Sequence, residues 1–160
     1  MKSIITIALL SVAVLLAVWP AQAEDKPIQI SLFSPVQIFA PDQSIAGLRL
    51  SILYGKNANM TGLDWGLVTT TTGNLVGVQA CFVGMVDGNS TGIQYGFVPM
   101  TKGTMTGLQW GFVTMAGHTE GLQLGFVNTT TTIHGLQIGL LNFIKKDGWL
   151  PLFPIVNGKL

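Results

Sequence analysis

The sequence predicts an all-β domain made of tandem repeats, and more finely an antiparallel up-and-down meander closing as a small barrel of about eight or nine strands. Three observations lead to this fold class. A glycine-led unit recurs every 15 or 14 residues, large and small side chains alternate within each unit, and the units carry almost no charge. The alternation favours strands over helices, because a period of two places successive side chains on opposite faces.

The chain begins with the pattern of a secretory signal peptide. Lys2 precedes an apolar run from Ile4 to Val18, and small residues follow up to Ala23. We therefore expect cleavage after Ala23. The apolar run is shorter than a comfortable membrane-spanning helix, so it is not expected to anchor the chain.

This cleavage divides the chain into a signal peptide (1–23) and a single repeat-built β domain (24–160). Within the domain, the repeats run from residue 47 to about residue 148, and a proline-bounded segment over 149–160 is expected to close the sheet.

The repeat unit begins with glycine and continues with an apolar residue, a polar residue and further apolar residues. Seven such units are spaced first by 15 and then by 14 residues, beginning at Gly47, Gly62, Gly77, Gly92, Gly107, Gly121 and Gly135. In the unit that starts at Gly107, Leu108, Trp110 and Phe112 point to one side of a strand, and Gln109 and Gly111 point to the other. Each unit is thus predicted to be one strand with a large apolar face and a small polar face.

Turn-forming residues separate the strands at the same period. They lie at Lys56-Asn57, Gly73-Asn74, Asp87-Gly88, Lys102-Gly103, Gly117-His118 and Asp147-Gly148. Dipeptides such as Asp-Gly are typical of hairpins, which would make consecutive strands antiparallel. In that register Gln94 lies opposite Gly111 and Ile93 opposite Phe112, so that large side chains meet small ones on the glycine side.

A β-solenoid with one 15-residue coil per unit is the alternative fold, and a soluble open sheet is a third. A solenoid is expected to need two apolar strands in each coil, so that opposing sheets bury each other. The second half of a unit, such as MTKGTMT, is too polar and rich in turn formers to meet that requirement. On this argument the meander is preferred.

The distribution of charge selects a membrane barrel among the meanders. Only Arg49 and Asp64 are ionisable within the repeat motifs, and strands that are uncharged on both faces are expected to be covered on both faces. Lipid would then cover Leu63, Trp65, Ile93, Tyr95, Leu108, Trp110, Phe112, Leu122 and Leu136. A structural polar ladder would line the narrow interior, formed by Arg49, Asp64, Gln79, Gln94, Gln109, Gln123 and Gln137.

The overall charge is low and balanced. Charged residues make up 9% of the chain, against roughly 25% in ordinary soluble domains. The formal net charge is +1, and it falls to zero when the signal peptide with Lys2 is removed. We expect no interaction with nucleic acid, because nothing in this composition attracts phosphates.

Residues with catalytic or metal-binding potential are few. His118 and His134 stand in or near turns with no second ligand at a useful spacing, so no metal or cofactor is expected. Cys81 replaces a glycine on the small face, where a buried and inert thiol is expected. Arg49 and Asp64 are interpreted as a structural ion pair rather than a catalytic one.

The repeats and the C-terminal segment resemble a known family. The Gly-Leu-Gln-Xaa-Gly-Phe-Val units, the lead-in TGLDWGLV, Leu141-Asn142 and the ending PLFPIVN are similar to a family of bacterial surface-repeat proteins of unknown function, with tandem GLQxGLxN-type repeats and a FPIxN-like tail. The resemblance covers about Gly47 to Asn157. It implies export to the envelope of a diderm bacterium, and it brings no catalytic residues.

These observations lead to a functional hypothesis. We expect a non-enzymatic structural protein of the bacterial cell envelope, a small outer-membrane β-barrel or a surface-associated repeat protein, whose partners are the lipid bilayer or envelope components. The alternative is a surface-exposed β-solenoid that acts as an adhesin or ligand-binding module.

Overall fold

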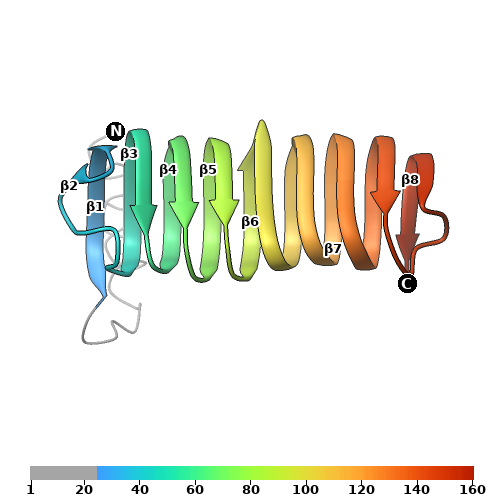
Figure 1. Cartoon of the computed structure of the whole chain (residues 1–160), viewed down its shortest axis with the longest axis horizontal. Helices are drawn as coiled ribbons and strands as arrows, with labels where there is room; N and C mark the ends of the chain where they lie inside the picture. Colours follow the sequence, from blue (N-terminus) through green and yellow to red (C-terminus); the bar gives the residue numbers. More distant parts are fainter. Residues whose placement is uncertain (1–24) are drawn as a thin grey trace, which may run out of the picture.

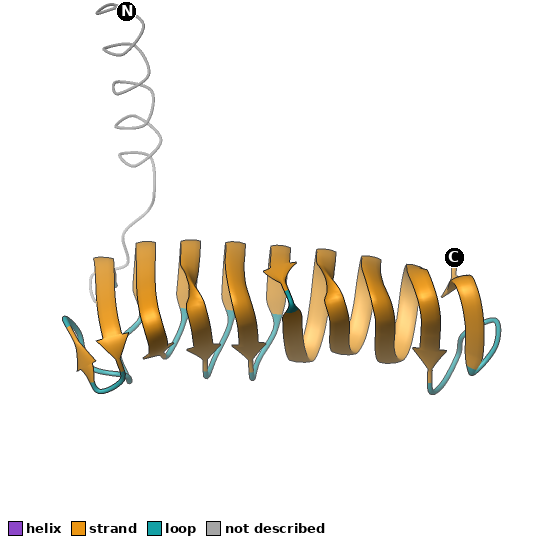
Figure 2. Ribbon diagram, turned by 90° about the horizontal axis from the view of Figure 1, so that it is seen from above, coloured by secondary structure: helices purple, strands orange, loops and turns teal. Residues whose placement is uncertain are grey.

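The computed structural model describes residues 25–160, and the expected signal peptide (1–23) lies outside the described residues. In this range the chain winds into an elongated β-solenoid whose coils stack along one axis (Figure 1). The strands are β1 (Lys26–Phe33), β2 (Val36–Gln37), β3 (Ile45–Asn57), β4 (Met60–Thr71), β5 (Leu75–Val86), β6 (Ser90–Gly96), β7 (Val98–Ile144) and β8 (Leu152–Lys159). β7 continues through several coils without a break (Figure 2).

Consecutive repeats pair in parallel and in register. Gly47 of β3 lies opposite Gly62 of β4, and Gly62 lies opposite Gly77 of β5. In the next pairs Gln79 lies opposite Gln94, and Gln94 lies opposite Gln109. Each repeat unit is therefore one coil, and equivalent residues of successive coils form straight rows along the axis.

The predicted antiparallel barrel of eight or nine strands is therefore wrong, and the observed fold is the β-solenoid. Gln94 meets Gln109 rather than Gly111, and Ile93 meets Leu108 rather than Phe112. The turn at Asp87-Gly88 does not reverse the strand direction, because β5 and β6 on its two sides are parallel. It is a corner that leads the chain into the next coil.

The prediction failed because each unit contributes two segments instead of one. The chain bends near Phe82, so that positions 81 and 84 face each other inside the coil: a Cβ added to Gly84 would lie 2.8 Å from Cys81 Sγ. The second segment does not need to be apolar, because the interior is narrow and is filled by small and hydrogen-bonded polar side chains. The expected requirement for two apolar strands per coil does not apply to such an interior.

The regular spacing of glycine at the start of each unit has a steric reason. Gly62 and Gly77 have φ angles of 120° and 130°, in a region that side chains disfavour. In addition, a Cβ on Gly77 would overlap the carbonyl oxygen of Gly62 in the preceding coil. A glycine at this corner therefore lets the coils approach to hydrogen-bonding distance.

A small apolar core occupies one inner corner of the solenoid. Ile45, Met60, Leu75 and Val86 pack together there, and Phe39 packs against them. Most other buried side chains are Gln, Thr, Ser or Asn. The large apolar side chains mostly point outward, which is the reverse of an ordinary globular domain.

Both ends of the solenoid depart from the parallel pattern. β2 pairs antiparallel with β1 at one end, and β8 pairs antiparallel with the last coil of β7 at the other. Pro154 of β8 offers no N–H group to a further strand, which is one way in which proteins limit edge-to-edge association. Over residues 25–160, the chain contains no helix with the length and apolar character needed to cross a membrane.

Candidate functional site

The polar residues singled out in the sequence form one row inside the solenoid. The Arg49 guanidinium donates two hydrogen bonds to the Asp64 carboxylate, at 2.7 Å to Oδ1 and 2.6 Å to Oδ2. Gln79 Nε2 donates to Asp64 Oδ2 at 2.8 Å. Arg49 and Asp64 are both completely buried, and the bidentate geometry offsets the cost of burying two charges.

The row continues as a chain of amides. Each glutamine donates from Nε2 to Oε1 of the glutamine in the preceding coil, at distances of 2.7 to 3.0 Å, from Gln94 to Gln79, Gln109 to Gln94, Gln123 to Gln109 and Gln137 to Gln123. All donors point the same way, towards Asp64. Since these side chains are fully buried and bonded to one another, the ladder is part of the interior and does not face solvent.

The cysteine and the histidines form no reactive cluster. Burial raises the pKa of the Cys81 thiol from 9.0 to about 12, and the charge of Asp64 adds to the shift, so the thiol is protonated at neutral pH. The Thr69 hydroxyl donates to Cys81 Sγ at 3.2 Å. His118 Nδ1 lies 2.6 Å from the Thr132 hydroxyl. Within residues 25–160, no group of three or more His, Cys, Asp or Glu side chains is placed to hold a metal ion.

The candidate site lies on the outer surface, where three rows of large side chains run along the axis. The leucine row contains Leu63, Val78, Ile93, Leu108, Leu122 and Leu136. The aromatic row contains Trp65, Ala80, Tyr95, Trp110, Leu124 and Ile138. The phenylalanine edge, where each coil bends, contains Leu67, Phe82, Phe97, Phe112, Phe126 and Leu140.

Side chains of these rows stack on one another along the axis but stay open to solvent. The rings of Phe82, Phe97, Phe112 and Phe126 are parallel, with centroids 4.9 to 5.0 Å apart. Trp65 is 62% exposed and Tyr95 is 50% exposed. Contiguous apolar surface of this extent on a chain usually marks a contact with a partner, a ligand or a membrane.

A groove runs between the aromatic row and the phenylalanine edge. It has a volume of about 980 Å³. Trp65, Tyr95 and Trp110 form one wall, and Phe82 and Phe97 form the other. Backbone of the small inward-facing positions, such as Gly96, forms the floor. Ala80 lies between Trp65 and Tyr95 in this wall, and its single methyl group leaves a notch between their large side chains.

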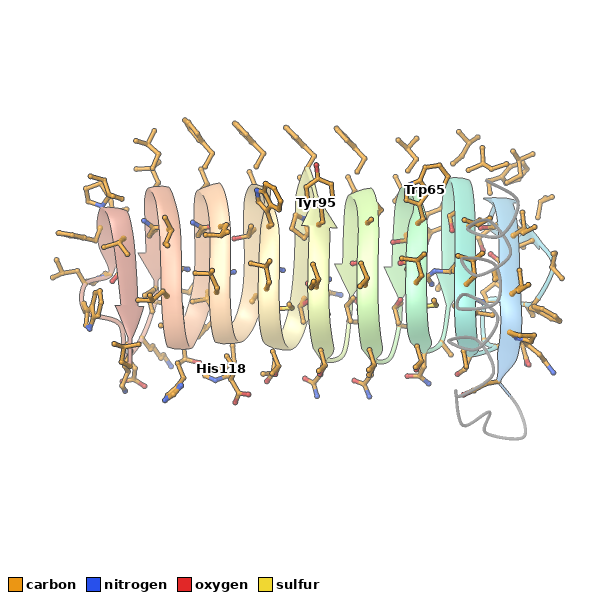
Figure 3. All side chains as sticks on the ribbon, turned by 180° about the vertical axis from the view of Figure 1, so that it is seen from behind. Trp65, Tyr95 and His118 are labelled. Carbon is orange, nitrogen blue, oxygen red and sulfur yellow. The ribbon has the colours of Figure 1, made fainter. Side chains whose placement is uncertain are left out.

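The opposite long edge of the solenoid is polar. This polar edge consists of the turn residues, with a ladder in which Asn59 Oδ1 accepts from the backbone N–H of Asn74, and Asn74 Oδ1 from that of Asn89, at 2.8 and 2.9 Å. Lys102 pairs there with Asp87 at 2.7 Å. Figure 3 shows His118 at this edge, and Trp65 and Tyr95 near the other.

The sequence identified the polar ladder but not the groove. The aromatic side chains were predicted to face lipid as a uniform surface, so nothing in that prediction separated one part of the row from another. The signal that would have located the groove is Ala80, which interrupts an otherwise large-residue row next to the series of phenylalanines.

Comparison with known proteins adds no assignment. No protein-family model matches the chain, and no curated protein or solved structure is significantly similar to it. The resemblance to bacterial surface-repeat proteins therefore stays a prediction from the repeat motifs.

Proposed function

We propose that this chain is an exported, non-enzymatic binding module of the cell envelope, which docks on a lipid surface through the phenylalanine edge. It belongs to the class of surface-exposed β-solenoid ligand-binding modules. The observation that carries the proposal is the separation of side chains between the two long edges: stacked aromatic rings on one, and charged and amide groups on the other.

The order of the outer rows supports a lipid surface as the partner. Phenylalanine occupies the extreme edge, and Trp65, Tyr95 and Trp110 lie two residues earlier in their coils. Phenylalanine side chains are suited to hydrocarbon, whereas Trp and Tyr favour the boundary between hydrocarbon and water. The two rows thus match the order of environments that a membrane surface presents with depth.

The terminal strand of the solenoid limits how deep the molecule can insert into a bilayer. β8 is the last strand of the sheet, so one side of its backbone has no neighbouring strand. Unpaired backbone groups are costly in hydrocarbon. This favours docking at the interface, with the phenylalanine edge inserted and the polar edge in water.

The state of the reactive side chains supports a binding role rather than catalysis. Arg49 and Asp64 are fully buried and pair with each other, and the Cys81 thiol is protonated and buried. A catalytic acid, base or nucleophile must reach a substrate in the correct protonation state. None of these three groups meets that condition.

Vesicle flotation tests the proposal. The processed chain should float with vesicles of neutral lipid, with a blue shift of tryptophan fluorescence. The double variant Phe97→Ser, Phe112→Ser should bind at least about 100-fold more weakly, since each buried phenylalanine contributes about 1.5–3 kcal/mol. The matched control Met100→Ser, Met115→Ser changes two outer side chains of the second segment and should bind like the unchanged protein.

Two further measurements identify the nature of the binding. Because the processed chain has no net charge, Arg49 and Asp64 are buried and the Lys102–Asp87 pair lies on the polar edge, binding should not depend on anionic lipid or on salt. Binding only to anionic vesicles would contradict the proposal. So would a chain that stays with the buffer and forms dimers that the Phe97→Ser, Phe112→Ser variant cannot form, since a second copy would then be the partner of the edge.

A further inference from the structure

The groove between the aromatic row and the phenylalanine edge has the dimensions of a site for a long, thin ligand. Its lining extends from Ser51 and Ile52 to Phe126, which is five steps from coil to coil. At ~4.8 Å per step, the groove is ~24 Å long. The two walls are separated by two residues along the strand, so the groove is only ~7 Å wide between Cβ atoms.

The groove offers almost nothing to a polar ligand. No charged residue lines it. The Ser51 hydroxyl faces inward and accepts a hydrogen bond from Ser31, and the Cys81 thiol is buried and neutral. The polar groups on the walls are the Tyr95 hydroxyl and the indole N–H groups of Trp65 and Trp110. A sugar or a peptide carries more donors and acceptors than these three groups can bond, so it would lose most of its hydrogen bonds to water here, which is unfavourable.

The floor cannot supply those hydrogen bonds either. Its backbone groups are already used between coils: the N–H of Phe97 donates to the carbonyl of Phe82 at 2.9 Å, and the N–H of Phe112 donates to that of Phe97 at 3.0 Å. In a parallel solenoid these bonds run along the axis, within the sheet. An apolar ligand on this floor therefore leaves no backbone group without a partner, and Trp65, Tyr95 and Trp110 are each at least half exposed, so that their polar groups can bond water.

We propose that this groove binds one unbranched hydrocarbon chain, which lies along the solenoid axis and enters the notch at Ala80. Its methylene groups pack against the rings of Trp65, Tyr95, Phe82 and Phe97. The site lies on the face that we propose to dock on lipid, but it does not need a bilayer, because a membrane lipid and a free fatty acid present the same chain.

Quenching of tryptophan fluorescence by dibromostearate tests this site. A Trp149→Phe background leaves Trp65 and Trp110, both in the groove wall, as the tryptophans of residues 25–160. Dibromostearate, used below the concentration at which it self-associates, should quench them to saturation with one chain bound per protein, and unbrominated stearate should reverse the quenching. Quenching that rises in proportion to the probe without saturation would overturn the proposal.

A pair of matched variants tests the position of the chain. Ala80→Phe fills the notch, and the row already accommodates large rings in the adjacent coils at Trp65 and Tyr95, so the fold should be kept. Its affinity for dibromostearate should fall about tenfold or more. Leu124→Phe adds a similar ring in the same row outside the groove lining and should bind within about twofold of the background protein. Equal affinities for these two variants would contradict the site, and Ala80→Leu serves as a smaller change in the same direction.

The flotation experiment separates this proposal from the proposed lipid docking. Saturable binding of dibromostearate without flotation would keep the groove as a site for free fatty acids and remove the docking function. Flotation without saturable quenching would keep the docking function and remove the groove. Flotation of Ala80→Phe at the unchanged level would show that docking by the edge does not require a chain in the notch.

Discussion

At the scale of single residues, the most consequential contact is the buried pair at the start of the polar ladder. Arg49 also donates to the carbonyl of Thr70 at 3.1 Å and to the hydroxyl of Thr71 at 3.0 Å, so its guanidinium is bonded on several sides. The Asp64 carboxylate accepts a hydrogen bond from Gln79 in addition to those from Arg49. The pair therefore behaves as one unit whose members depend on each other.

Removing one member of this pair is expected to cost more than removing both. Asp64→Asn leaves the Arg49 charge buried without a counterion, which should lower the free energy of unfolding by about 3–5 kcal/mol. The double variant Arg49→Gln, Asp64→Gln extends the glutamine ladder and should lie within about 1 kcal/mol of the unchanged protein. Urea denaturation followed by circular dichroism measures both values, and a double variant as unstable as Asp64→Asn would contradict this account.

At the scale of the repeat unit, the two segments of a coil are matched in size across the narrow interior. Where the first segment carries Ser51 or Cys81, the facing position of the second is Gly55 or Gly84. In the other units glycine is on the first segment, and the buried facing residues are Thr69, Pro99, Thr114, Asn128 and Asn142. At each of these pairs of facing positions, the interior of the coil thus has room for one side chain larger than glycine.

A double-mutant cycle at Cys81 and Gly84 tests this match. Gly84→Thr should destabilise the protein by about 1–3 kcal/mol, because the new side chain overlaps both Gln79 Oε1 and Cys81 Sγ. Adding Cys81→Gly recreates the combination of Gly66 with Thr69 and removes the overlap with Cys81 but not that with Gln79, so it should recover part of the loss, with a coupling energy within the range of about 0.5–3 kcal/mol. Additive effects in urea denaturation would show that the two positions do not share one space.

The same scale explains what the sequence could and could not predict. The period, the strands and the separation of Gln109 from Trp110 onto opposite faces follow from alternation alone. The direction of the next strand does not, because an Asp-Gly corner suits a hairpin as well as a solenoid turn. The bend near Phe82 carries no proline or glycine pair, so the two segments of a coil read as one strand.

At the scale of the whole molecule, the fold reverses the usual distribution of polarity. The prediction assumed that an interior filled by polar side chains could not hold a solenoid together. It therefore assigned the apolar faces of the strands to lipid and predicted a membrane barrel. The interior is instead held by the hydrogen bonds of the amide ladder, and the large side chains are left outside. The groove was missed because it depends on a relation between rows in neighbouring coils, and the smaller side chain of Ala80 in its row gains a meaning only once the coils are stacked.

Because every coil repeats the same register, one whole coil should be removable. Deleting residues 92–106 joins Thr91 to Gly107, and Thr91 takes the place of Thr106, with which it pairs in the intact solenoid. Gln109 then meets Gln79, and all later coils keep their orientation. The product should fold cooperatively, be shorter by about 4.8 Å in small-angle scattering, and have a slightly smaller dependence of unfolding free energy on urea.

Deleting residues 92–98 removes only the first segment and joins Thr91 to Pro99, so that register is lost and the chain should not fold cooperatively. In an antiparallel meander, the loss of one unit would reverse every later strand, and both deletions would be equally damaging. A 15-residue deletion that unfolds the chain as completely as the shorter one would therefore contradict the closed coil as the unit of this fold.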